Sequence, residues 1–142
     1  MAFQLKNSLT FVSSRLANHL QEAFNRELAV LDISWSQWLV VHCLASGQAS
    51  TPAEIARRLC ISRPVVTRLL DRLEAKGLVE RLNDREDRRS VSVRISEPGR
   101  LLIEYMDAAA VRHETSALEQ FGVESLRMLQ RATQKLDSIP DS

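Results

Sequence analysis

Three arginines and three acidic residues crowd into NDREDRRS, the segment from Asn83 to Ser90, which has no apolar side chain. A guanidinium group binds phosphate or carboxylate oxygens through two parallel hydrogen bonds, so an acidic neighbour can hold it in a fixed orientation. Most charged runs, however, are only solvated turns. The elements around this segment decide which interpretation applies.

A second set of candidate residues begins at Arg63. On a helical wheel one side of this segment holds Val66, Leu69, Leu70 and Leu73, and the other holds Pro64, Thr67, Arg68, Asp71 and Ala75. A hydroxyl and a guanidinium near a helix N-terminus are what a helix in a DNA major groove presents to base edges. We expect Arg68 to contact guanine and Thr67 to reach a thymine methyl group or a phosphate. Ser62 and Arg63 are expected close to the DNA backbone.

The composition is that of a chain able to bury a core. Its 142 residues include 44% hydrophobic types and only four glycines and four prolines, which excludes collagen-like and disordered classes. The longest uncharged apolar run, WLVVHCLA, is too short to span a bilayer. The N-terminal sequence has no signal-peptide pattern. We therefore expect a cytoplasmic protein with no membrane contact.

Positive charge is concentrated in the middle of the chain. Twelve basic and eight acidic residues lie from Glu54 to Arg100, a net charge of +4, whereas the whole chain carries +1. This asymmetry indicates a surface that meets a polyanion, although an ordinary basic surface gives the same count.

Apolar residues at steps of three and four predict helices towards both ends of the chain. The first stripe comprises Leu5, Leu9, Val12, Leu16, Leu20, Ala23 and Phe24, in an amphipathic helix that we expect to run on towards Leu31. A second helix fits the segment from Ser34, its N-cap, to Gly47. Beyond Pro98 and Gly99, one further stripe carries Leu101, Leu102, Tyr105, Met106 and Ala109, and a last one carries Leu126, Leu129, Ala132, Leu136 and Ile139.

Two capped helices lie close together in the middle of the chain. Thr51 precedes Pro52 and stands three residues before Glu54, which predicts a capping box with proline at the first helical position. Ser62 offers the next N-cap, and Gly77 is placed to end that second helix in the left-handed conformation. This tight pair is a candidate helix-turn-helix.

The apolar pattern then changes from helical steps to alternation. Residues 78–82 and 91–96 each alternate, with Val91, Val93 and Ile95 on one face of the second segment and Ser92, Arg94 and Ser96 on the other. Two strands flanking the charged segment predict a β-hairpin, or wing, with NDREDRRS at its tip. A wing beside a helix in the major groove lies near the adjacent minor groove, whose negative potential attracts arginine.

The residues of the tip can therefore be given roles. We expect Arg89 to enter the minor groove and Asp87 to orient its guanidinium. Arg85 and Arg88 are expected on phosphates.

The stretch TPAEIARRLCISRPVVTRLLDRLEAKGLVERLNDREDRRSVSVRISEPGR resembles the winged helix-turn-helix of MarR-type bacterial transcription regulators, including the SlyA-like branch. The resemblance implies a mainly α fold with a small β-hairpin (α+β), flanked by N- and C-terminal dimerisation helices. By position it puts Pro64 and Arg68 on the recognition helix and Arg89 at the wing tip. The expected domains are an N-terminal dimerisation helix (1–34), a winged DNA-binding domain (35–100) and C-terminal dimerisation helices (101–142).

The same resemblance implies a ligand-responsive repressor that binds a pseudo-palindromic operator in double-stranded DNA as a homodimer. A small anionic or phenolic effector would weaken that binding. The apolar stripes at both chain ends favour a dimer independently, because they exceed the surface that a winged domain can cover. A two-fold dimer sets its recognition helices about one duplex turn, roughly 34 Å, apart.

Aromatic and basic residues of the first two helices form the candidate effector site. They are Arg15, His19, Trp35, Trp38 and His42, and the resemblance puts a ligand cavity between the dimerisation helices and the winged domain. Trp38 and His42 share a helix face because they are four residues apart. The alternative is ordinary core packing with a satisfied imidazole.

We expect no metal and no cofactor. The spacing of the three histidines does not resemble a zinc site. Cys43 and Cys60 are too few for a metal framework, and we interpret them as reduced thiols in apolar settings rather than as a disulfide. A redox-sensing role would need an accessible thiolate of low pKa.

Two other functions are weighed against DNA binding. An enzyme would need a nucleophile with its base, a phosphate-binding glycine loop or paired carboxylates in a cleft, and the sequence shows no such arrangement. A winged helix used only as a protein-protein module would present an acidic or neutral recognition face. The five arginines assigned above to that helix and to the wing argue against this alternative.

Overall fold

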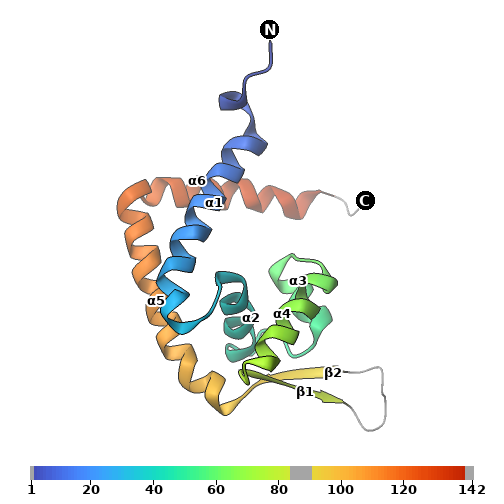
Figure 1. Ribbon diagram of the computed structural model, residues 1–142. Coiled ribbons are helices and arrows are strands. Elements are labelled where there is room, and N and C mark those ends of the chain that lie inside the picture. The colour runs from blue at the N-terminus through green and yellow to red at the C-terminus, as the bar shows by residue number, and fades with distance from the viewer. Residues whose placement is uncertain (1, 84–90, 140–142) are drawn as a thin grey trace.

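The computed structural model describes residues 2–83 and 91–139. Its helices are α1 (Leu9–Leu28), α2 (Trp35–Ala45), α3 (Pro52–Leu59), α4 (Arg63–Ala75), α5 (Glu97–Phe121) and α6 (Val123–Gln134), its strands are β1 (Val79–Asn83) and β2 (Val91–Ile95), and short 3-10 turns occupy Leu5–Asn7, Ala29–Leu31 and Lys135–Ser138. Helices α2 to α4 and the hairpin gather at one end of the molecule, α6 lies at the other end, and α5 connects the two (Figure 1). The predicted mainly α fold with one β-hairpin is confirmed.

The helix-turn-helix forms where its caps predict. Ser62 accepts a hydrogen bond from the Val65 amide at the start of α4 over 3.4 Å, and Gly77, just beyond the end of α4, has a φ of 74°. Between the two helices the chain turns at Cys60, a non-glycine residue with a left-handed φ of 56°. The left-handed turn and the Ser62 cap together set α4 at an angle to α3 within a few residues.

Two of the predicted helix starts differ in detail from the structure. The capping box predicted at Thr51 is only half formed: Thr51 accepts from the Glu54 amide over 3.2 Å, but its hydroxyl donates to the Glu54 carboxylate over 3.0 Å. The carboxylate therefore bonds the cap side chain instead of the cap amide. The N-terminal helix begins at Leu9 rather than Leu5, because Ser8 is extended and accepts from the amide of Phe11 over 3.1 Å.

The hairpin is antiparallel and pairs Val79 with Ile95 at its base. Ser96 is buried, which contradicts its predicted place on the outer face with Arg94. Its hydroxyl caps α5 by accepting from the Gly99 amide over 3.1 Å, and it donates to the carbonyl of Gly77. Helix α5 is thereby fixed directly to the hairpin base.

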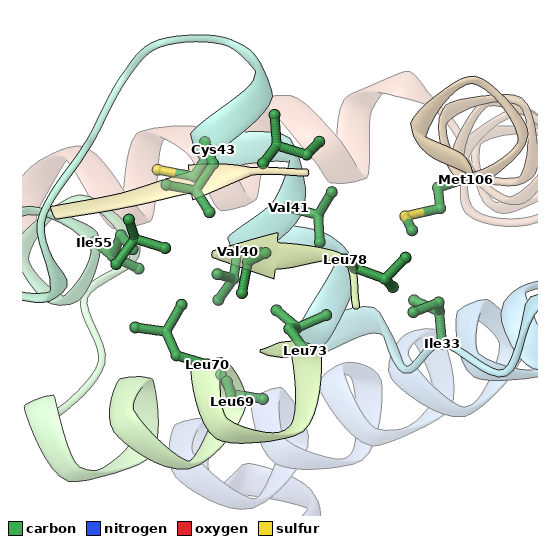
Figure 2. Close-up of a cluster of buried hydrophobic side chains, with 14 of the residues drawn as sticks. Ile33, Val40, Val41, Cys43, Ile55, Leu69, Leu70, Leu73, Leu78 and Met106 are labelled. Atoms are coloured by element: carbon green, nitrogen blue, oxygen red, sulfur yellow. The ribbon is translucent and has the colours of Figure 1, made fainter. Parts of the chain in front are cut away.

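The core lies between α2, α3, α4 and the hairpin, and it extends to Phe24 and Leu28 of α1 and to Met106 of α5. Figure 2 shows Val40 of α2, Ile55 of α3 and Leu73 of α4 in one cluster of side chains, and each of these three is fully buried. The apolar side predicted for the fourth helix, comprising Val66, Leu69, Leu70 and Leu73, is buried in full and therefore confirmed. Its opposite side is left facing solvent.

Apolar side chains at the two ends of the chain remain outside this core. Leu9 on α1 is 87% exposed, Leu136 is 61% exposed, and α6 buries no residue. A single protomer thus leaves a large apolar surface uncovered at the end of the molecule away from the hairpin.

Over the described residues, no single helix has the length and apolar character needed to cross a membrane. One bent pair, residues 9–31 with residues 35–45, passes that test by length and composition.

Candidate nucleic-acid interface

The N-terminal half of α4 presents one continuous exposed face. It carries all five residues that the sequence assigned to this helix and its cap, namely Ser62, Arg63, Pro64, Thr67 and Arg68. Neither Arg63 nor Arg68 forms an ion pair with an acidic residue of the described part of the chain. Both guanidinium groups can therefore meet an external acceptor without first breaking such a bond.

The helix end itself offers few donors. Pro64 has no N–H, and the Val65 amide is already used by the Ser62 cap. A phosphate at this end would therefore meet side chains such as Arg63 rather than a row of open backbone amides.

Thr67 has its hydroxyl turned towards its own helix, where it donates to the carbonyl of Arg63 over 3.0 Å. That bond uses the only hydroxyl proton of the side chain. Of the two contacts expected for Thr67, this rotamer favours an apolar contact by the methyl group over hydrogen-bond donation to a phosphate.

Arg81 of β1 also lies at this surface, although the sequence pattern did not single it out. Its Nη1 lies 2.7 Å from Asp71 Oδ1 and 3.7 Å from Glu74 Oε1, and its Nη2 donates to the Thr67 carbonyl over 3.2 Å. The alternation of the strand residues could have indicated these contacts for Arg81. It shares a strand face with buried Val79, and a charged side chain on a partly buried face needs hydrogen-bond partners.

A recess lies where α3, α4 and the hairpin meet. Its volume is about 490 Å³, and its lining is Thr51, Pro52, Ala53, Arg63, Thr67, Leu70, Arg81 and Val91. The recess places the exposed face of α4 next to the hairpin, so one ligand surface could touch both elements.

The wing-tip predictions for Arg85, Asp87, Arg88 and Arg89 lie outside the described residues. The described ladder ends at the pair Asn83 and Val91, from which that segment begins and to which it returns.

The five candidate effector residues do not form a single site. Trp35 and Trp38 line a mainly apolar cavity of about 330 Å³ together with Phe24, Leu39 and His113, whereas Arg15, His19 and His42 are absent from its lining. His19 instead packs edge-on against Phe121 of α5, with ring centroids 5.7 Å apart. The helix spacing that placed these residues on nearby turns did not place them on one face.

Trp38 and His42 do share a face, as expected, and they share a partner on α5. The Trp38 indole donates to Asp107 Oδ1 over 3.0 Å, and His42 Nδ1 lies 3.3 Å from the same oxygen. The imidazole therefore has a partner, but its side chain is 45% exposed and does not pack in the core.

The cysteines occupy different environments. Cys43 is buried, and this burial raises the pKa of its thiol. The nearby charge of Arg58 lowers that pKa and the charge of Glu54 raises it, both by less than burial does. Cys60 is exposed, so the apolar setting predicted for it is wrong; it occupies the turn between α3 and α4 rather than a helix face. Within the described ranges no group of three histidine, cysteine or acidic residues could hold a metal ion.

Comparison with known sequences agrees with this arrangement. The sequence model of the MarR family matches residues 33–91, which span α2 to the start of β2. The HTH-type transcriptional regulator FarR of Neisseria gonorrhoeae is 29% identical over 123 residues, covering 87% of this chain and 84% of FarR. The multiple antibiotic resistance protein MarR of Escherichia coli K12 is 36% identical over 80 residues.

The chain belongs to the MarR family.

Solved MarR-family structures have the same fold over nearly the whole chain. A mutant of E. coli MarR complexed with operator DNA has a TM-score of 0.79 at 25% identity, covering 90% of this chain and 92% of that one. The transcriptional repressor CouR bound to a 23-mer DNA duplex has a TM-score of 0.81 at 26% identity, covering 96% of this chain and 99% of that one. The segment aligned with the full E. coli MarR sequence spans 56% of that protein's length.

Proposed function

We propose that this MarR-family protein is a sequence-specific DNA-binding regulator that represses transcription from a pseudo-palindromic operator. The observation that carries the proposal is the exposed face of α4, with Arg63 and Arg68 beside Thr67 on a helix whose other face is fully buried. The related FarR is a transcriptional regulator, and the structures of MarR and CouR contain DNA.

On this proposal α4 is the recognition helix. Arg68 donates two hydrogen bonds to a guanine, and the Thr67 methyl group contacts a thymine. Ser62, Arg63 and Pro64 lie against the sugar-phosphate backbone and set the register. The exposure of these five residues and the rotamer of Thr67 support these roles.

The segment between β1 and β2 supplies the second contact of the proposal. Its composition supports an insertion of Arg89 into the minor groove, oriented by Asp87, with Arg85 and Arg88 on phosphates.

We further propose a homodimer formed by the chain ends, residues 1–34 and 101–142. The exposed apolar residues of α1, α6 and the turn that follows α6 support it, because burying each such side chain stabilises an interface by about 1.5–3 kcal/mol. A two-fold axis then gives an operator with inverted half-sites.

The cavity lined by Trp35 and Trp38 is the proposed effector site for a small anionic or phenolic compound. Its apolar lining and its position between α1, α2 and α5 support this role. Bound there, a ligand would alter the packing of the dimerisation helices on the winged domain and so the spacing of the two recognition helices.

Selection of bound duplexes from a random pool tests the proposed function. We expect the recovered sequences to be inverted repeats with half-sites about 10 base pairs apart. Recovery of no enriched duplex, together with no salt-dependent affinity for DNA, would instead favour the winged helix as a protein-protein module.

A further inference from the structure

The contacts of Arg81 follow one stripe of the recognition helix. Thr67, Asp71 and Glu74 stand at steps of four and three, so they lie above one another on α4 over two helical turns. Arg81 reaches all three from the neighbouring strand. Its guanidinium therefore keeps the hairpin close to α4 and also prevents it from sliding along the helix axis.

The rest of the hairpin is fixed by its backbone. Val93, the ladder partner of Arg81, donates to the carbonyl of Ser50 over 2.7 Å, and Ser96 donates to the carbonyl of Leu78 over 3.0 Å. These bonds hold the strands to the segment before α3 and to the hairpin base. Among side chains of the described residues, Arg81 alone forms an ion pair between the hairpin and α4.

The positive charge of Arg81 also offsets the negative charges of Asp71 and Glu74 on α4. Asp71 and Glu74 are partly exposed carboxylates on the helix that is proposed to face DNA, where phosphates would repel them. Arg81 places one positive charge between these two negative charges. Its side chain is only 25% exposed and already bonded, so it is not available as a phosphate ligand in the way that Arg68 is.

We propose that Arg81 is a positioning residue for sequence discrimination, an inference that rests on the proposed DNA-binding function. It sets the angle between α4 and the hairpin, so that the helix and the segment between β1 and β2 fit their two grooves at once. Arg81 acts by holding that angle and by neutralising the negative charge of Asp71. It makes no contact with a phosphate.

The test compares Arg81→Met with the wild-type protein. Affinities are measured for a selected operator and for a scrambled duplex of the same length, each over a range of salt concentrations. We expect the ratio of operator affinity to scrambled-duplex affinity to fall about tenfold, because the ion pair between Arg81 and α4 no longer holds the hairpin at its angle to the helix. We expect the salt slope on the scrambled duplex to stay unchanged, because no phosphate contact is removed.

Arg94→Met is the matched control. Arg94 forms an ion pair of the same length, 2.7 Å from Nε to Glu80 Oε2, but its partner is a residue of the hairpin and not of α4. We expect it to leave the affinity ratio as in the wild type. Arg81→Lys is expected to recover part of the ratio, because an ammonium group can still bond one of the acceptors.

A second variant keeps the inference testable if Arg81→Met unfolds. Asp71→Asn alters an exposed side chain, and we expect it to lower the affinity ratio as well. If Arg81→Met folds, adding it to Asp71→Asn should lower the ratio little further, since both changes remove the ion pair between Arg81 and Asp71.

The outcomes separate the inference from the function on which it rests. If the wild-type protein binds no duplex, the proposed function is wrong. If it binds and Arg81→Met keeps the wild-type ratio, or lowers the salt slope by about one unit as loss of a phosphate contact would, the positioning role is wrong.

Discussion

At the scale of single residues, Arg68 carries the most specific expectation. It is exposed, and it belongs to none of the ion pairs among the described residues, which supports its proposed contact with a guanine edge. We predict that Arg68→Ala weakens operator binding by about 1–3 kcal/mol and relaxes selection at one base pair per half-site. Competition binding against a panel of single-base operator variants measures both effects.

Arg89→Ala is the natural contrast to Arg68→Ala. It should weaken binding mainly on operators with A·T-rich flanks, since a narrow minor groove is what attracts the arginine. Equal losses for both variants on every sequence would contradict the separate roles of helix and wing.

The two thiols are predicted to differ in reactivity. An aromatic disulfide reagent should label Cys60 in the folded protein and Cys43 only after unfolding, because Cys43 is buried with its pKa raised by that burial. Above about pH 8.5 the unfolded thiol ionises while the folded one does not, so the stability contributed by Cys43 is lost as the pH rises. Labelling of two thiols per folded chain would show that the core around α2 opens.

The sequence predicted correctly which side chains of α4 are exposed. It did not predict which residues contact one another in the folded chain. Helical periodicity is a property of one segment, so the buried and exposed faces of α4 follow from it directly. The role of Arg81 depends on a strand packing against a helix, and the division of the effector candidates depends on where α5 crosses α2. The spacing of residues along the chain does not report either of these tertiary contacts.

At the scale of elements, the junction between the hairpin and α5 leaves no room for a side chain at Gly99. A Cβ atom added at Gly99 would lie 2.3 Å from the Leu78 carbonyl oxygen and 2.7 Å from Ile95 Cγ1. We predict that Gly99→Ala lowers the free energy of unfolding by about 1–3 kcal/mol, despite the better helix propensity of alanine. Urea denaturation measures it.

Arg100→Ala provides the control at this junction. Arg100 is the next residue of α5 and is exposed, so its substitution should change stability by less than about 0.5 kcal/mol. A Gly99→Ala protein as stable as this control would mean that α5 can shift away from the hairpin.

Local signals predicted the elements of the winged domain to within a few residues. Ser34, Thr51 and Ser62 are caps in the structure, and the alternating segments form the two strands. The start of α1 was missed because the apolar stripe extends past the Ser8 cap, and a stripe does not report where hydrogen bonding begins.

At the scale of the whole molecule, the exposed apolar chain ends predict that the protomer does not act alone. We expect the double variant Leu9→Asp/Leu136→Asp to weaken dimerisation on the order of 100-fold or more, because each change removes apolar burial and places a charge in the interface. Both side chains are largely exposed in the protomer, so its fold should survive. Sedimentation equilibrium measures the change.

Val30→Asp is the control for this prediction. Val30 belongs to the segment 1–34, but it lies in the turn Ala29–Leu31, at the opposite end of α1 from Leu9. It is 85% exposed, and its substitution should leave the dimer intact. A double variant that still dimerises like the wild type would show that α1 and the chain end after α6 are not the interface.

The central claim is that two copies of this chain bind one duplex through α4 and the wing. Sedimentation velocity of a fluorescent duplex recovered by selection tests it most directly. We predict that the duplex carries two chains and that its affinity falls steeply as salt rises, because arginine–phosphate contacts release counterions. A duplex that sediments alone at the lowest ionic strength, or that carries a single chain, would contradict the account.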